Sequence, residues 1–197
     1  MELDQIKSYF TPTNILDIGA NVGGWYNHCK SYFPDSYILS IEANEGCESA
    51  LKACNPNYII ALLAKDEEMY DFFTLRDAPT ATGNSIYKEL TYVYTDNSTI
   101  INKKKGVMLD NLLRNRSFNL IKMDVQGAEL DVIKGGLTIC KQAKGIILEV
   151  AFEAYNQNAP LYDEVIEYMS SIGFSKELIL TNLPQHHDIF FINKNIL

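Results

Sequence analysis

The segment that most constrains the fold is an apolar run that ends in an acid and then in a glycine-rich turn. It spans residues 15–25 and reads Ile-Leu-Asp-Ile-Gly-Ala-Asn-Val-Gly-Gly-Trp. Glycine permits positive φ and leaves space for a ligand, so this turn lets backbone approach a ligand at the end of a strand. Glu42 closes the next apolar segment, roughly 20 residues further on, where a nucleotide-binding βαβ unit places its ribose-binding carboxylate. The two features together predict a cofactor of the adenosine type.

The rest of the chain alternates between short apolar segments and helical patterns. Such alternation predicts a parallel sheet with helices on both faces. The last two apolar segments are joined by residues 181–187, which look like a hairpin connection, so the final strand is expected to run antiparallel. That closing hairpin is typical of the class I methyltransferase fold and is missing from NAD-binding Rossmann domains. Strands are expected over 14–18, 37–42, 58–63, 120–125, 145–150, 178–180 and 188–192.

Length and composition fit one domain. The 197 residues suffice for one good core, and 47% hydrophobic with 21% charged residues is typical of a globular chain. We expect residues 1–197 to form one Rossmann-like α/β domain, with a mostly parallel seven-stranded sheet and an antiparallel last strand. Residues 1–12 are expected to form a helical segment. Residues 66–108 interrupt the βα rhythm after the third strand, and we expect a small insertion there with strands over 70–75 and 92–95.

Charge and cysteine usage narrow the class of protein. The net charge of −8 disfavours a nucleic-acid partner, because phosphate binding needs clustered Lys and Arg. The one basic run, Lys103–Lys105, is expected to be a solvated loop. The four cysteines form no C-x-x-C pair and are expected to be reduced thiols. The acidic, polar start and the lack of a long apolar run predict a cytoplasmic protein without a signal peptide or a membrane span.

The first turn favours S-adenosylmethionine over a dinucleotide. It does not match G-x-G-x-x-G, and S-adenosylmethionine has no pyrophosphate but needs room for a methionine moiety. In this interpretation Asp17 anchors the turn or the ligand's amino group, while Gly19 and Gly23 give clearance. Asn21 offers its amide to the carboxylate, and Glu42 accepts both ribose hydroxyls. The further cofactor-binding candidates are Ala20, Trp25, Ala43, Asn44, Ala64, Ser85 and Asp124.

Glu42 also has a plain structural interpretation. An acid beside the N-terminus of the following helix is favoured by the helix dipole without any ligand. We prefer the ribose interpretation because the glycine turn and the acid occur together.

The fourth expected strand carries the motif that points to a family. Residues 121–130 read Ile-Lys-Met-Asp-Val-Gln-Gly-Ala-Glu-Leu, and with residues 17–25, 109–110 and 147–150 they closely resemble the FkbM family of S-adenosylmethionine-dependent methyltransferases. The family signature Lys-x-Asp-x-Glu-Gly-x-Glu matches at Lys122, Asp124, Gly127 and Glu129. Gln126 replaces the usual Glu. The resemblance covers residues 14–173 and implies O-methylation of a hydroxyl on a sugar, polysaccharide or natural product.

Catalytic groups are expected at the carboxyl ends of the strands, where open α/β sheets bind ligands. Asp124 ends its strand beside the expected methyl group, and Lys122 shares a face with it. The alternative for this pair is a buried structural ion pair. Glu149 ends the next strand and faces the same crevice.

The closing hairpin brings histidines toward the same crevice, because its antiparallel strand starts at the ligand face. His187 or His186 is therefore a candidate base, with His187 preferred and two exposed loop histidines as the alternative. A His-His-Asp metal site lacks support from ligand spacing, so no metal is predicted. The catalytic candidates are Asp124, Lys122, Glu149 and His187.

Two loops are candidate walls of the site, with ordinary surface loops as the alternative. Residues 77–85 have the composition of a lid, and Asn84 and Ser85 are placed to close over the cofactor. Residues 151–160 mix aromatic rings with amides, which suits a small-molecule or carbohydrate acceptor.

Other functions have less support. An NAD-dependent oxidoreductase would need a second glycine in the first turn, and a non-catalytic cofactor-binding protein of the same fold is supported mainly by Gln126. The sequence leaves both a monomer and a homodimer open.

Overall fold

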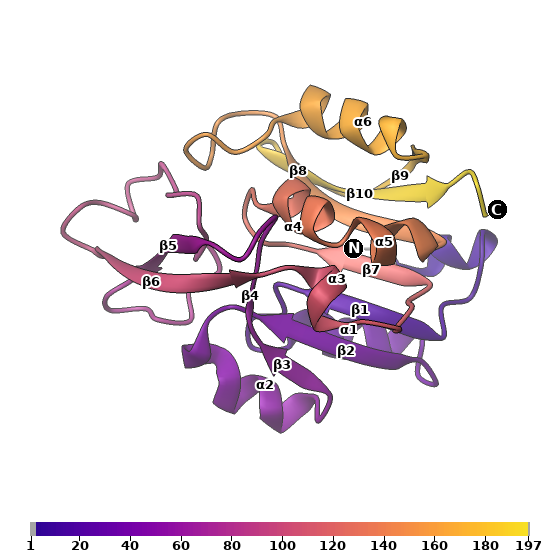
Figure 1. Cartoon of the computed structure of the whole chain (residues 1–197), viewed down its shortest axis with the longest axis horizontal. Coiled ribbons are helices and arrows are strands. Elements are labelled where there is room, and N and C mark those ends of the chain that lie inside the picture. The colour runs from indigo at the N-terminus through magenta and orange to yellow at the C-terminus, as the bar shows by residue number, and fades with distance from the viewer. Residues whose placement is uncertain (1–2, 197) are drawn as a thin grey trace.

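A seven-stranded sheet forms the centre of the molecule in the computed structural model, which describes residues 3–196 (Figure 1). The strand order is β3-β2-β1-β7-β8-β10-β9. These strands are β1 (Asn14–Ile18), β2 (Tyr37–Glu42), β3 (Tyr58–Ile60), β7 (Leu120–Met123), β8 (Gly145–Ala151), β9 (Phe174–Asn182) and β10 (His186–Asn193).

The direction of the strands confirms the expected fold class. β1 runs parallel to both β2 and β7, and the parallel pairing continues outward to β3 and β8. β10 is antiparallel to both β8 and β9. The strand order reverses beside β1, and in open α/β sheets such a switch point forms a ligand crevice at the carboxyl ends of the strands.

Helices cover both faces of this sheet. In Figure 1, α3, α4 and α5 lie in front of the sheet and α1 lies behind it. Side chains alternate along each strand, so Leu120 joins the apolar cluster behind the sheet while Ile121 joins the cluster in front. The helical elements are η1 (Leu3–Ser8), α1 (Gly24–Tyr32), η2 (Glu45–Cys47), α2 (Glu48–Cys54), α3 (Leu109–Leu112), α4 (Glu129–Gly135), α5 (Leu137–Gln142) and α6 (Tyr162–Ser171).

The insertion contributes two strands to a second, three-stranded sheet, and these two strands project to the left in Figure 1. Its strands are β4 (Leu62–Leu63), β5 (Met69–Leu75) and β6 (Thr99–Val107), in the order β4-β6-β5. The strand expected over 58–63 is therefore divided. β3 stays in the main sheet, whereas β4 pairs with β6.

The second strand of the insertion was placed wrongly at 92–95. Tyr92 is 91% exposed, and Ser98 holds the segment in a turn by donating hydrogen bonds from its hydroxyl to Val93 O and Thr95 O. The true strand, β6, includes Lys103–Lys105, which is therefore not a solvated loop. Cross-strand ion pairing explains how so basic a run forms a strand, since Lys103 Nζ lies 2.5 Å from the Asp71 carboxylate on β5.

The chain ends differ from expectation in smaller ways. The N-terminal helical segment is the 3-10 helix η1, and residues 1–2 of the expected segment lie outside the described residues. β9 and β10 are longer than expected, and only residues 183–185 connect them. Between residues 3 and 196, no helix has both the length and the apolar character needed to cross a membrane.

Candidate functional site

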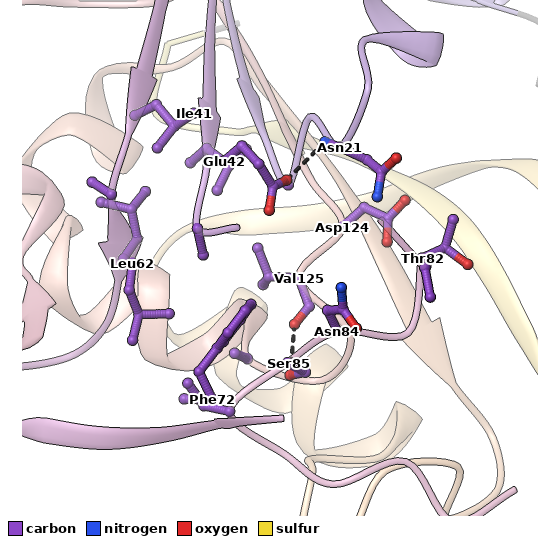
Figure 2. A pocket seen from close by; sticks show the side chains of 18 residues that line it. Asn21, Ile41, Glu42, Leu62, Phe72, Thr82, Asn84, Ser85, Asp124 and Val125 are labelled. Atoms are coloured by element: carbon purple, nitrogen blue, oxygen red, sulfur yellow. Dashed lines mark hydrogen bonds between the residues drawn. The ribbon is translucent and has the colours of Figure 1, made fainter. Parts of the chain in front are cut away.

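A pocket lies at the switch point of the main sheet, between the carboxyl ends of β1, β2 and β7 and the insertion (Figure 2). Its walls are apolar on the side of Ile41, Leu62 and Phe72, and polar at Glu42 and Asp124. The lining residues are Ile18, Gly19, Asn21, Ile41, Glu42, Ala43, Ala61, Leu62, Leu63, Phe72, Ala81, Thr82, Asn84, Ser85, Ile86, Asp124, Val125 and Ala128.

The glycine-rich turn brings β1 and β7 into close backbone contact at the pocket floor. Gly19 has φ +77°, and a Cβ at this position would lie 1.8 Å from the Asp124 carbonyl oxygen. Asp124 N in turn donates a hydrogen bond to Ile18 O at 3.0 Å. Only glycine fits there, for both conformational and steric reasons.

Gly19→Ala is expected to lower the free energy of unfolding by roughly 2 kcal/mol or more, because alanine resists the left-handed conformation and its Cβ forces the two strands apart. Chemical denaturation measures this. Gly24→Ala is the matched control, since a Cβ there meets no atom within 4 Å among the described residues. The control should be neutral or slightly stabilising, and equal losses in the two variants would contradict the close-contact explanation.

Glu42 is fixed at the rim of the pocket by the turn that follows β1. It is 8% exposed, and its carboxylate accepts hydrogen bonds from Asn44 N at 2.8 Å and from Asn21 N at 2.7 Å, the second of which is drawn in Figure 2. Burial raises the pKa of Glu42, although these backbone donors and Lys122 oppose the shift. The carboxylate can still accept further bonds, because each oxygen has two lone pairs.

The loop between β5 and β6 closes over the same rim. Asn21 Nδ2 donates a hydrogen bond to Thr80 O at 3.1 Å, and Asn44 Nδ2 donates to Pro79 O. Ser85 Oγ, at the far end of the loop, bonds to Val125 O at 3.0 Å. The loop that the sequence marked as a lid thus lies over the pocket, tied to β1, β2 and β7 by side-chain donors.

A buried ion cluster lies beneath the pocket. Lys122 Nζ is 3.2 Å from Asp124 Oδ2 and 3.9 Å from Asp17 Oδ1. Burial raises the pKa of Asp17 to about 6, even though Lys122 opposes the shift. Burial also raises the pKa of Asp124, but Lys122 and the hydrogen bonds it receives outweigh this effect and hold its pKa below the usual range. Asp124 is therefore ionised at neutral pH.

Polar side chains continue from this cluster across β8 to β10. Gln126 Nε2 donates to Asp124 Oδ1 at 2.7 Å and to Glu149 Oε2 at 2.6 Å, and His186 Nε2 lies 2.9 Å from Glu149 Oε1. Burial raises the pKa of Glu149, although His186 opposes the shift. The hydrogen bond to Glu149 raises the pKa of His186. Lys122, Asp124, Gln126, Glu149 and His186 thus form one continuous row, which we call the polar row.

The two histidines occupy opposite faces of β10. His186 contacts Glu149, whereas His187 packs edge-on against Phe152 with ring centroids 4.4 Å apart. The structure therefore gives His186, and not the preferred candidate His187, the place in the polar row. Residues 181–187 were expected to form a loop, and neighbouring side chains of a loop need not point to opposite sides. Both histidines belong to β10, where successive side chains do point to opposite faces.

The predicted cofactor-binding residues divide into two groups. Gly19, Asn21, Glu42, Ala43, Ser85 and Asp124 line the pocket. The others support it from outside: Trp25 packs in the apolar cluster behind the sheet under Lys122, and Ala64 is buried against Gly135. The predicted residues that do not line the pocket are Asp17, Ala20, Gly23, Trp25, Asn44 and Ala64.

Sequence reasoning missed much of the apolar wall. Phe72 and Ile86 come from the insertion, and Leu62 follows the unexpected break after β3. In the sequence, all three are apolar residues in or beside the segment that interrupts the alternation of strands and helices. This pattern does not indicate which face of the insertion packs against the pocket.

A second hollow lies on the other side of the Gln126–Gly127 turn. Glu129 at the start of α4 and Glu149 on β8 line it, together with Glu153, Tyr155 and Asn156 from the loop after β8. Burial raises the pKa of Glu129 to about 8, and the nearby Glu149 adds to the shift. Within residues 3–196 there is no group of three or more His, Cys, Asp or Glu side chains arranged to hold a metal ion.

Comparison with solved structures defines the class of fold. A methyltransferase FkbM from Methylobacillus flagellatus matches with a TM-score of 0.59 at 13% identity, over 91% of this chain and 43% of that one. A TehB-like methyltransferase from Corynebacterium glutamicum matches with a TM-score of 0.54 at 10% identity, over 97% and 86% of the two chains. A magnesium protoporphyrin IX methyltransferase from Synechocystis, solved with bound S-adenosylmethionine, matches with a TM-score of 0.52 at 11% identity, over 96% and 74%. Together with the strand order, these matches define a class I methyltransferase fold.

The family follows from the sequence itself. The model of the methyltransferase FkbM domain matches residues 17–176, so the chain belongs to the FkbM methyltransferase family. The chain spans less than half the length of the FkbM structure it matches. Comparison with curated protein sequences gives no match.

Proposed function

We propose that this protein transfers a methyl group from S-adenosylmethionine to a hydroxyl of a small polar acceptor, such as a sugar or a natural product. The observation that carries the proposal is that the pocket at the switch point borders directly on Asp124, the member of the polar row that lies at its wall. Membership of a methyltransferase family and the Synechocystis structure with bound S-adenosylmethionine support this cofactor.

The pocket fits the parts of S-adenosylmethionine. The backbone at Gly19 lines the pocket where the methionine moiety would lie, and the Glu42 carboxylate has free lone pairs for the ribose hydroxyls. The apolar side chains of Ile41, Leu62 and Phe72 suit the adenine ring. When bound, this cofactor supplies an electrophilic methyl group on a positively charged sulfur.

The pKa values of the side chains in the polar row are shifted in different directions, which suggests different roles for them. Asp124 has a lowered pKa, so it stays ionised and is suited to orient the acceptor hydroxyl by accepting its hydrogen bond. Burial raises the pKa of Glu149, so its carboxylate is a stronger base than an ordinary glutamate, whereas the raised pKa of His186 favours the charged imidazolium that pairs with Glu149. Alignment of the hydroxyl oxygen by Asp124 and removal of its proton by the Glu149 carboxylate, which His186 holds in place, would both favour transfer.

The second hollow is the proposed acceptor site. Tyr155 and Asn156 offer an aromatic face and an amide, which suit a hydroxylated molecule. The side chains of Glu129, Glu149 and Glu153 line the same space and no Lys or Arg is among its lining residues, so an acceptor that carries phosphate or carboxylate would meet carboxyl groups instead of a cationic partner. We therefore expect a neutral or cationic acceptor.

Transfer of a labelled methyl group tests the proposed function. The protein would be incubated with methyl-labelled S-adenosylmethionine and a panel of neutral sugars, amino sugars, phosphorylated sugars and hydroxylated aromatic compounds. We expect label in at least one neutral or cationic hydroxyl compound and none in the phosphorylated sugars. Cofactor binding without transfer to any member of a broad panel would favour a non-catalytic binding protein of the same fold.

A further inference from the structure

Gln126 holds the two carboxylates of the polar row together with a single nitrogen atom. Its Nε2 lies 2.7 Å from Asp124 Oδ1 and 2.6 Å from Glu149 Oε2. A side-chain amide nitrogen carries two hydrogens, so each carboxylate receives one. Because two like charges in a part-buried site repel each other, a donor shared between them stabilises the arrangement.

The backbone around Gln126 is fixed independently of its side chain. Gln126 has φ +55°, in the left-handed region, and its carbonyl oxygen lies 2.9 Å from Ser85 Oγ, whose single hydrogen it shares with Val125 O. Glu129 Oε1 accepts bonds from Val125 N and Gly127 N on either side of it. The turn thus presents the amide to both carboxylates from a fixed point.

We propose that Gln126 is a positioning residue, whose amide nitrogen bridges Asp124 and Glu149 and sets the spacing of these two carboxylates around the acceptor hydroxyl. The role in positioning the acceptor hydroxyl rests on the proposed function. The bridge between the two carboxylates depends only on the two hydrogen bonds of Gln126 Nε2. Gln126 acts through its two neighbours and lines neither the pocket nor the second hollow.

An amide at position 126 can donate hydrogen bonds to both carboxylates, whereas a carboxylate cannot. An ionised glutamate of the same length has no hydrogen to donate, and a protonated one has a single hydrogen for two acceptors. The substitution Gln126→Glu would therefore place a third carboxylate against two others, and the group of three would take up a proton. The titratable groups around this position are Lys122 on β7, Asp124 directly after β7, Glu129 on α4, Glu149 on β8, and His186 and Asp188 on β10.

The pKa of the introduced carboxyl in the folded and unfolded states determines how the stability of Gln126→Glu changes with pH. Repulsion raises the pKa of the introduced carboxyl in the folded state above its ordinary value of about 4.3. Its destabilising effect therefore appears as the pH rises through and above that range, and disappears as the pH falls. The other groups titrate in the wild-type protein too, so the difference between the two proteins isolates position 126.

The experiment compares the melting temperatures of wild type, Gln126→Glu and Gln142→Glu between about pH 5 and pH 9. Gln142 is exposed at the end of α5, so its substitution adds the same charge away from the site. We expect Gln126→Glu to melt roughly 5 °C or more below wild type at the alkaline end and to approach wild type at the acidic end. Gln142→Glu should follow wild type throughout.

An activity readout separates positioning from a merely structural role. At alkaline pH, turnover of Gln126→Glu on the acceptor found in the panel should fall more than tenfold and recover toward acidic pH. Affinity for S-adenosylhomocysteine should stay within about threefold of wild type, because Gln126 does not line the pocket. A melting difference that does not change with pH, or an unchanged pH profile of turnover, would overturn the proposal.

Failure of the proposed function would look different. If the wild-type protein itself does not bind S-adenosylhomocysteine, the methyltransferase assignment fails. The pH dependence of the melting temperature then still decides whether the bridge exists.

Discussion

Asp124→Asn is expected to lower the rate of methyl transfer by a factor on the order of 10² to 10⁴, the range typical of losing an aligned acid–base or charge-stabilising group. Asparagine has the same shape as aspartate but no charge. It also brings an amide NH₂ into a place where both neighbours, Gln126 Nε2 and Lys122 Nζ, already donate. The polar row would therefore lose its alignment at the wall of the pocket. Initial rates with labelled S-adenosylmethionine measure the effect.

The control for this substitution makes the same chemical change far from the site. Asp35 is exposed in the turn before β2, at the opposite end of the strands, and Asp35→Asn should leave the rate unchanged. Circular dichroism should show that Asp124→Asn remains folded. A wild-type rate in a folded Asp124→Asn protein would remove this carboxylate from the mechanism.

Glu42→Ala is expected to weaken cofactor binding by a factor on the order of 10² or more. Hydrogen bonds from ribose hydroxyls to a charged acceptor are worth roughly 1.5–3 kcal/mol each. The substitution also removes the acceptor that aligns the backbone N–H groups of Asn21 and Asn44 at the rim of the pocket. Calorimetric titration with S-adenosylhomocysteine measures the loss.

Glu45→Ala is the matched control, because Glu45 lies three residues further along the chain and its carboxylate pairs with Lys104 outside the pocket. Its affinity should be that of wild type. Equal affinity in wild type and Glu42→Ala would instead favour the plain alternative, in which Glu42 only supports the N-terminus of the helix that follows.

The main sheet could be predicted because each of its signals is local. An apolar run followed by a glycine turn or a helical pattern marks a strand wherever it occurs, and the handedness of βαβ connections then orders the strands. The crevice and the positions of Gly19, Glu42 and Asp124 at its edge follow directly, since all three lie at the carboxyl ends of predicted strands.

The insertion could not be predicted to the same extent. The sequence of β6 is dominated by Lys103–Lys105, and only its pairing with β5 makes such a run a strand. The tyrosines at 92 and 94 gave a stronger strand signal where the chain forms turns. The apolar wall around Phe72 depends on how the insertion packs against the main sheet. No local sequence pattern predicts that packing.

Lys122, Asp124 and Glu149 were expected in one crevice, but the contacts through Gln126 that join them into the polar row could not be predicted, for a related reason. Asp124, Gln126 and Glu149 come from the ends of two adjacent strands, and their contacts depend on the left-handed turn at Gln126. From the sequence, Gln126 was only a departure from the family motif. The choice between His186 and His187 likewise depends on which face of the sheet each side chain occupies in β10. A shift of one residue in the register of this strand exchanges the two faces.

Calorimetric titration of the wild-type protein with S-adenosylmethionine and S-adenosylhomocysteine shows whether the pocket at the switch point binds the cofactor. We expect both compounds to bind at a single site with micromolar affinity and to raise the melting temperature. An absence of heat and of any thermal shift with either compound would contradict the assignment of the pocket at the switch point as a cofactor site.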